Sequence, residues 1–186
     1  CLLRPARGRS EYLLEMIDFL LTRLDLAPSD TDLLVAVTGP GSFTGLRIGI
    51  GAVRGLAMAA GRPAAGIPAL QAMAASIGDR GAPLAPVLDA GRGEIYAGLY
   101  SASVEGAEIP RQMQPDAVLS PGRLREFLGD VQAIVFGPGA ERYAEQIAAA
   151  AGPPLRRLPT APPAGCLAAA AGRLALKRIE AGEGPA

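Results

Sequence analysis

The sequence predicts an α/β fold made of two related lobes. Residues 33–60 begin with a short apolar segment, continue through a glycine-rich turn and end in a helical pattern. Residues 84–100 hold two strand-like segments around a tight turn, which is typical of a β-hairpin. The order strand, Gly-Pro-Gly, helix occurs at 35–41 and again at 134–139. This repetition indicates two units of similar design.

Residues 78–83 are the best linker candidate, because Gly78, Gly81 and Pro83 separate a helical pattern from the hairpin. We therefore divide the chain into a first lobe, residues 1–80, and a second lobe, residues 81–186. A chain of 186 residues is long enough to bury a core, as one large domain or as two small lobes.

The first lobe opens with a helix expected at 11–24, with Ser10 as its N-cap. Its apolar side chains cover about 220° of the circumference, against about 100° for an ordinary surface helix. One face of the helix can pack on the sheet. The remaining apolar side chains must be covered by something else. That cover is either the rest of the same fold or a protein partner. The candidate interface residues on this helix are Tyr12, Met16, Phe19 and Leu20.

A second helix, expected at 45–60, is rich in glycine. Each glycine in a helix interior costs about 1 kcal/mol relative to alanine, so the pattern indicates that another backbone must come close. Arg47 and Arg54 are seven residues apart and fall on one side of this helix. They form either a solvated face or the polar edge of an interface. The candidate interface residues are Arg47, Ile50, Gly51, Arg54, Gly55 and Met58.

The turn at 39–45 leads into this helix, and backbone N–H groups at such a position can hold an anion. The turn lacks the Gly-Lys-[Ser/Thr] of a P-loop, and no acidic residue occurs between Asp32 and Asp79, where a dinucleotide site would need one. A nucleotide loop and a purely structural turn therefore both remain open. The candidate anion or nucleotide residues are Gly39, Gly41, Ser42, Thr44, Gly45 and Asp89.

In the hairpin, Ile95, Ala97 and Leu99 should face one side and Tyr96 and Tyr100 the other. A polar connection is expected after it. The remaining expected elements are a short strand or turn at 66–69, a helix at 70–77, a helix from Ser120 to Leu128, a strand at 132–136, a helix at 140–151 and a last helix that follows Pro163 and ends near Gly182.

Composition excludes several chemistries. The 186 residues include no histidine, so they cannot form a histidine-liganded metal site, a Ser-His-Asp triad or a Cys-His pair. Asp89 and Glu94 bracket the hairpin turn. Asp89 either bonds to its own backbone, or the two carboxylates coordinate a metal. We expect no catalytic residue, no metal and no tightly bound cofactor.

The charge balance and the cysteine content limit the binding partners and the cellular compartment that we expect. The 18 basic and 18 acidic residues balance, so any role on RNA needs a partner to supply the positive field. Two cysteines do not make a disulfide framework, which fits a reducing, cytoplasmic compartment. No apolar run is as long as a membrane span.

Three motifs resemble the TsaB (YeaZ) family: Gly-Pro-Gly-Ser-Phe-Thr-Gly-Leu-Arg-Ile-Gly at 39–49, Gly-Leu-Ala at 55–57 and Val-Leu-Asp-Ala-Gly-Arg-Gly-Glu-Ile-Tyr at 87–96. The resemblance implies two ribonuclease-H-like lobes of the actin/Hsp70 ATPase superfamily. Members of the family open with a strand and hairpin not found in this sequence, so we expect the first lobe to lack its N-terminal strands. The family's His-Ser-Glu appears as Arg-Ser-Glu at 9–11.

The resemblance also implies a function. Proteins of this family are non-catalytic paralogues of TsaD, which transfers threonylcarbamoyl to adenosine 37 of ANN-decoding tRNAs. They pair with TsaD through their first two helices, a TsaE-like ATPase joins the pair, and they form homodimers when alone. ATP would then act only in the assembled complex, and tRNA would be reached only indirectly. Two hypotheses of other classes are a nucleotide-binding enzyme that uses the Gly39 loop and Asp89, and a peptidase, suggested by an older glycoprotease label of the family.

Overall fold

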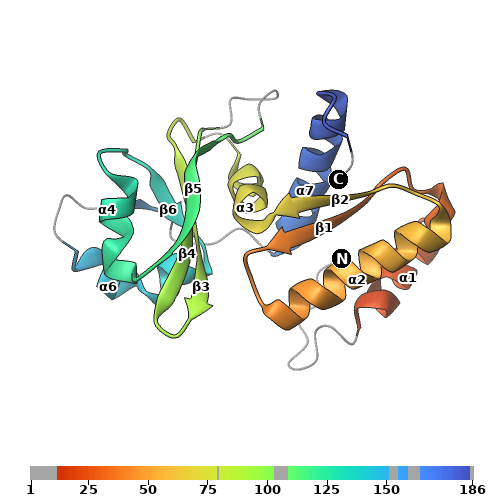
Figure 1. Cartoon of the computed structure of the whole chain (residues 1–186), viewed down its shortest axis with the longest axis horizontal. Helices are drawn as coiled ribbons and strands as arrows, with labels where there is room; N and C mark the ends of the chain where they lie inside the picture. The colour runs from red at the N-terminus through yellow and green to blue at the C-terminus, as the bar shows by residue number, and fades with distance from the viewer. Residues whose placement is uncertain (1–11, 79, 103–108, 151–154, 159–163, 185–186) are drawn as a thin grey trace. The chain divides into compact units, whose positions relative to one another are not determined.

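The computed structural model describes residues 12–78, 80–102, 109–150, 155–158 and 164–184 as a mixed α/β protein (Figure 1). The chain divides into two compact units. The first comprises the described parts of Cys1–Pro68 and Ala171–Ala186, and the second comprises those of Ala69–Ala170.

The first unit is built on two parallel strands, β1 (Leu34–Gly39) and β2 (Ala64–Pro68). The helix α2 (Phe43–Ala60) connects them and packs on β1. It begins where the Ser42 Oγ accepts a hydrogen bond from the Gly45 N–H at 3.4 Å. It ends at Gly61, whose left-handed backbone (φ 63°) suits a glycine C-cap.

The helix α1 (Leu13–Arg23) and the short 3-10 helix η1 (Pro28–Asp30) precede β1. The expected N-cap Ser10 lies outside the described residues. The Arg62 guanidinium donates two hydrogen bonds to the Ser29 carbonyl, which ties η1 to the segment that follows α2.

The second unit holds a five-stranded sheet of order β5-β4-β3-β6-β7. β3 pairs antiparallel with β4 and parallel with β6, so the hairpin forms the centre of the sheet. The elements of this unit are α3 (Ala69–Ile77), β3 (Leu84–Gly91), β4 (Glu94–Tyr100), β5 (Gln112–Leu119), η2 (Pro121–Arg123), α4 (Leu124–Leu128), β6 (Ile134–Phe136), α5 (Pro138–Arg142), α6 (Ala144–Ala148), β7 (Arg156–Arg157) and the first part of α7 (Ala164–Glu180).

Helices cover both faces of this sheet, with α4 and α6 on one side and α3 on the other (Figure 1). The alternation expected for β4 is confirmed: Ile95, Ala97 and Leu99 pack with the α4–α6 side, and Tyr100 and Tyr96 with the α3 side. A strand with both faces buried against helices explains why β3 and β4 read as apolar segments in the sequence.

Several sequence predictions need correction. The polar connection expected after the hairpin contains a further strand, β5. Among the described residues it pairs only with β4, and it carries a proline, so it is an edge strand with few apolar positions. The helix expected at 140–151 begins two residues earlier and is split at Tyr143 into α5 and α6. The short strand β7 was not predicted.

The unit boundary also differs from the predicted one at residue 80. The helix α3 belongs to the second unit, because Leu70, Met73 and Ala74 are buried together with Leu84 and Tyr100. The end of α7 belongs to the first unit, where Ala175 and Ile179 line a cavity of about 160 Å³ together with β2. Packing therefore places the boundary at Pro68/Ala69 rather than at the glycine-rich segment 78–83.

Candidate partner interface

The helix α2 turns only one side toward its own unit. Ala57 is its one buried residue, and Leu46 and Val53 are half-buried on the same side. The opposite side is open to solvent, with Met58 82% exposed. Five of the six residues predicted on this helix are exposed: Arg47, Gly51, Arg54, Gly55 and Met58. Ile50 is half-buried.

Three glycines of α2 have no packing neighbour among the described residues. A Cβ added at Gly49, Gly51 or Gly55 would meet no atom within 4 Å. Each glycine nevertheless costs about 1 kcal/mol relative to alanine in a helix interior. The chain's own described fold therefore supplies no steric reason for these three glycines.

The helix α1 has no buried residue. Of the four residues predicted on it, Tyr12, Phe19 and Leu20 are exposed and Met16 is half-buried. Leu14 and Leu24 are exposed as well, although their sequence pattern did not single them out. A helix that leaves so many large apolar side chains in water is typical of a surface that another protein covers.

Two arginines on this surface make cation–π contacts with aromatic rings. The Arg47 guanidinium lies 5.2 Å from the centre of the Phe43 ring, and that of Arg23 lies 5.3 Å from the Phe19 ring. Phe43 is 72% exposed and was not predicted as an interface residue. Its position four residues before Arg47 on α2 is the sequence signal for this contact.

The predicted anion loop is shorter than expected. Thr44 and Gly45 already belong to the first turn of α2, and Ser42 is the N-cap residue. The Gly45 N–H, one of the donors that an anion would need, is bonded to Ser42 Oγ. Gly39 has φ 112° and is joined to Pro40 by a cis peptide bond. The contacts of this loop are those of a strand-to-helix turn.

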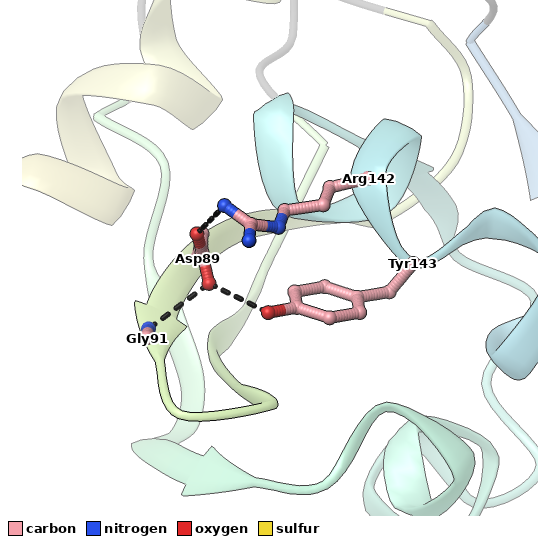
Figure 2. Close-up of polar contacts among 4 residues, drawn as sticks. All are labelled: Asp89, Gly91, Arg142 and Tyr143. Carbon is pink, nitrogen blue, oxygen red and sulfur yellow. Dashed lines mark hydrogen bonds and ion pairs between the residues drawn. The ribbon is translucent and has the colours of Figure 1, made fainter.

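Asp89 is the sixth predicted anion-site residue, and it belongs to the second unit. Figure 2 shows three donors around its carboxylate. Its Oδ1 accepts from the Gly91 N–H at 2.9 Å and from the Tyr143 hydroxyl at 2.9 Å, and its Oδ2 accepts from Arg142 Nη1 at 2.7 Å. The Gly91 N–H, followed by Tyr143, holds the pKa of Asp89 below its usual value.

The described structure gives Asp89 the contacts of a structural turn residue. The carboxylate accepts from its own turn at Oδ1, as an Asp at such a position commonly does, and its Oδ2 is paired with the Arg142 guanidinium. Glu94, the other predicted metal ligand, is exposed, and it makes none of these three hydrogen bonds to Asp89.

Arg142 and Tyr143 were not predicted, although the topology contains the signal for them. β3 and β6 are parallel, so their carboxyl ends lie at the same edge of the sheet. Asp89 lies near that end of β3, and α5 starts directly after β6. The second Gly-Pro-Gly turn therefore brings the end of α5 to Asp89.

Within the described ranges, no three His, Cys, Asp or Glu residues gather as a metal site would need. None of the helices in those ranges has the length and apolar content of a transmembrane helix.

Similarity to known proteins defines the class of protein to which this chain belongs. Residues 5–155 match the family model of TsaD, tRNA N6-adenosine threonylcarbamoyltransferase. The YeaZ structure from Pseudomonas aeruginosa superposes with a TM-score of 0.77 at 30% identity, covering 96% of this chain and 80% of that one. A second P. aeruginosa structure, of an uncharacterized protein with similarity to peptidase YEAZ, gives 0.76 at 31% identity over the same shares.

Curated relatives make the assignment more specific. Three proteins named tRNA threonylcarbamoyladenosine biosynthesis protein TsaB match. The Bacillus subtilis protein is 34% identical over 94 residues (50% of this chain, 41% of the relative) and the Escherichia coli protein 34% over 122 residues (64% and 52%). The Haemophilus influenzae protein is 43% identical over 68 residues (37% and 29%). The chain spans about half the length of these relatives or less. It belongs to the TsaB (YeaZ) family, as its three motifs predicted.

Proposed function

We propose that this protein acts in the biosynthesis of threonylcarbamoyladenosine (t6A) in tRNA, as a non-catalytic subunit that binds a TsaD-like protein and holds it competent for transfer to adenosine 37 of ANN-decoding tRNAs. The names of its three curated relatives support the pathway. One observation carries the subunit role: α2 presents glycines with open space over Gly51 and Gly55 beside an 82% exposed Met58.

The proposed interface comprises the exposed face of α2 together with the apolar side chains of α1. A partner helix can come closer to a glycine than to any other residue, so the helix-propensity cost of these glycines is offset only in a complex. In the absence of the TsaD-like partner, the same surface would pair two copies of this chain. A TsaE-like ATPase would join the assembled pair, and ATP and tRNA would engage the complex in the cytoplasm rather than this subunit alone.

We further propose that the two compact units correspond to the two ribonuclease-H-like lobes of the actin/Hsp70 ATPase superfamily. The two Gly-Pro-Gly turns support this, because each follows a strand, precedes a helix and begins with a glycine at nearly the same φ: 112° at Gly39 and 108° at Gly137.

The decisive test is reconstitution of t6A formation on tRNA with purified TsaD-like and TsaE-like proteins, with and without this chain. Activity should require the chain and should be lost with Gly55→Leu, which fills the space that the partner backbone needs. Gly172→Leu is the matched control, since Gly172 is also helical and a Cβ added there would meet no atom within 4 Å. If Gly55→Leu leaves co-purification with the TsaD-like protein unchanged, the proposed interface is wrong.

The second candidate, a nucleotide-binding enzyme, is favoured only by the Gly-rich turn at the N-terminus of α2. Calorimetric titration of ATP or ADP into the isolated protein tests it, and absence of heat at millimolar nucleotide removes it. A peptidase is disfavoured by the lack of any histidine to activate Ser42 or Thr44 within the 186 residues. A casein digestion assay checks this point.

A further inference from the structure

Two arginines on the exposed face of α2 have no acidic partner among the described residues. Arg47 and Arg54 are both exposed, and none of the ion pairs in that part of the chain involves either of them. Arg47 stacks on Phe43, which orients its guanidinium without neutralising it. Within the described part of the chain, neither charge is compensated.

The sequence around them reinforces this charge. Residues 33–78 contain three arginines and no aspartate or glutamate. The third arginine, Arg62, is bonded to the Ser29 carbonyl. The uncompensated charge of this segment thus concentrates on Arg47 and Arg54, one on each side of Gly51 along α2.

Helix geometry sets their spacing. Seven residues correspond to about 10 Å along the axis and to nearly two full turns, so both arginines lie on one edge of the exposed face. Gly51 and Met58 lie toward the middle of that face, and Gly55 and Ile48 lie toward its other edge. The face therefore has a cationic edge and an apolar strip with room for close approach.

The position of both arginines on one edge of the face favours some binding partners over others. If two copies of α2 pack antiparallel about a two-fold axis near Gly51, each arginine edge meets the arginine edge of the other copy, with Arg47 of one chain near Arg54 of the second. Like charges then gather on one side of the interface, which opposes self-association. An acidic partner instead gains favourable pairs at the same positions.

We infer that Arg47 and Arg54 select a partner protein whose docking surface carries two carboxylates about 10 Å apart beside an apolar ridge, and that they weaken, relative to this partner, an antiparallel pairing of α2 with that of a second copy. The inference rests on the proposed function, since it specifies the chemistry of the partner at the same interface. Its signature is an opposite salt dependence of the two assemblies: salt screens an attraction in the complex with the partner and a repulsion in the homodimer.

The test measures the dissociation constant for the purified TsaD-like protein at low and at high NaCl concentration. Arg47→Glu/Arg54→Glu should weaken binding by about tenfold or more at the lower salt concentration, and Arg47→Lys/Arg54→Lys should stay within about threefold. Arg173→Glu, an exposed arginine of α7, is the matched control and should bind like the wild type. Sedimentation of the chain alone should show a homodimer that is strengthened by salt and by Arg47→Gln/Arg54→Gln.

The outcomes separate the two claims. If the wild type binds the TsaD-like protein and the double glutamate variant binds it equally well, the inference is overturned and the proposed function stands. If the double variant keeps partner affinity but loses tRNA retention, the arginines serve nucleic acid and the inference is again wrong. If the wild type does not bind the TsaD-like protein at all, both claims fall. Circular dichroism confirms that each variant is folded.

Discussion

Arg142 donates from Nη1 to Asp89 Oδ2 over 2.7 Å, and this ion pair joins the end of α5 to the β3–β4 hairpin. The two residues are separated by 53 positions in the chain. The Tyr143 hydroxyl reaches Oδ1 of the same carboxylate (Figure 2). Asp89 is thus a structural junction of the second unit, and its charge is compensated inside the described fold.

The first prediction concerns the pH dependence of stability. The pKa of Asp89 is lower in the folded protein than its ordinary value of 3.8, so the ionised form stabilises the fold. This stabilisation is fully present well above pH 3.8 and is lost as the pH falls below that value through the folded-state pKa. Asp89→Asn should therefore unfold at lower urea concentration than the wild type near neutral pH, and the difference should shrink in strong acid.

Tyr143→Phe is the companion variant, because it removes one donor and keeps the ring. Its unfolding midpoint near neutral pH should lie between those of the wild type and Asp89→Asn. A wild-type advantage over Asp89→Asn that stays constant into strong acid would contradict the assigned role of the carboxylate.

The second prediction concerns the glycines of α2. Because a Cβ at Gly51 or Gly55 meets open space, each Gly→Ala change should stabilise the isolated chain by about 0.4–1 kcal/mol. The same changes should weaken binding to the TsaD-like partner. Urea unfolding and a pull-down assay on the same preparations measure the two effects, and a loss of stability would show that the glycines serve the chain's own fold.

The third prediction uses the opposite kind of glycine. A Cβ at Gly139 would lie 2.6 Å from the Leu88 carbonyl carbon, which is backbone and cannot turn aside. Gly139→Ala should therefore destabilise the second unit by about 1–3 kcal/mol through overpacking. Urea denaturation followed by tyrosine fluorescence measures this, and a neutral result would contradict the close approach of α5 to β3.

The fourth prediction tests the unit boundary. Leu70 on α3 is fully buried against Phe136 and Tyr100 in the second unit. Leu70→Ala should lower the free energy of unfolding by about 2–5 kcal/mol. Leu14→Ala, at an exposed position on α1, should lower it by less than about 0.5 kcal/mol. Hydrogen exchange should show the loss of protection in β3 and β6. If protection falls only in residues 12–68, α3 belongs with the first unit, as the sequence-based boundary assumed.

Local sequence patterns predicted helices and strands well where the periodicity of apolar residues matched the side of the element that is buried. The hairpin, both Gly-Pro-Gly turns and the helices α1, α2 and α3 lie close to their predicted ranges. β5 was missed because an edge strand needs few apolar side chains, and the Gln112–Leu119 segment accordingly reads as polar. The break at Tyr143 was missed because nothing in residues 140–151 resembles a helix stop.

The candidate residues divide in the same way. Eight of the ten predicted interface positions are exposed, since helical periodicity alone tells which side chains share a face. The loop at 39–45 and Asp89 were grouped as one candidate site because of their residue types. Residue type alone does not tell how far apart two residues lie in the folded chain. The structure assigns the loop to the first unit and Asp89 to the second, and it surrounds Asp89 with donors from α5 and from the adjoining turn.

The amino-acid sequence alone determined the family, the α/β class and the exposed glycine face of α2, because motifs and periodicity are local properties of the chain. Only the tertiary structure decided that α3 packs with the second unit and that Arg142 and Tyr143 meet Asp89. Those contacts join residues tens of positions apart. They arise from the parallel pairing of β3 with β6, which local composition does not encode.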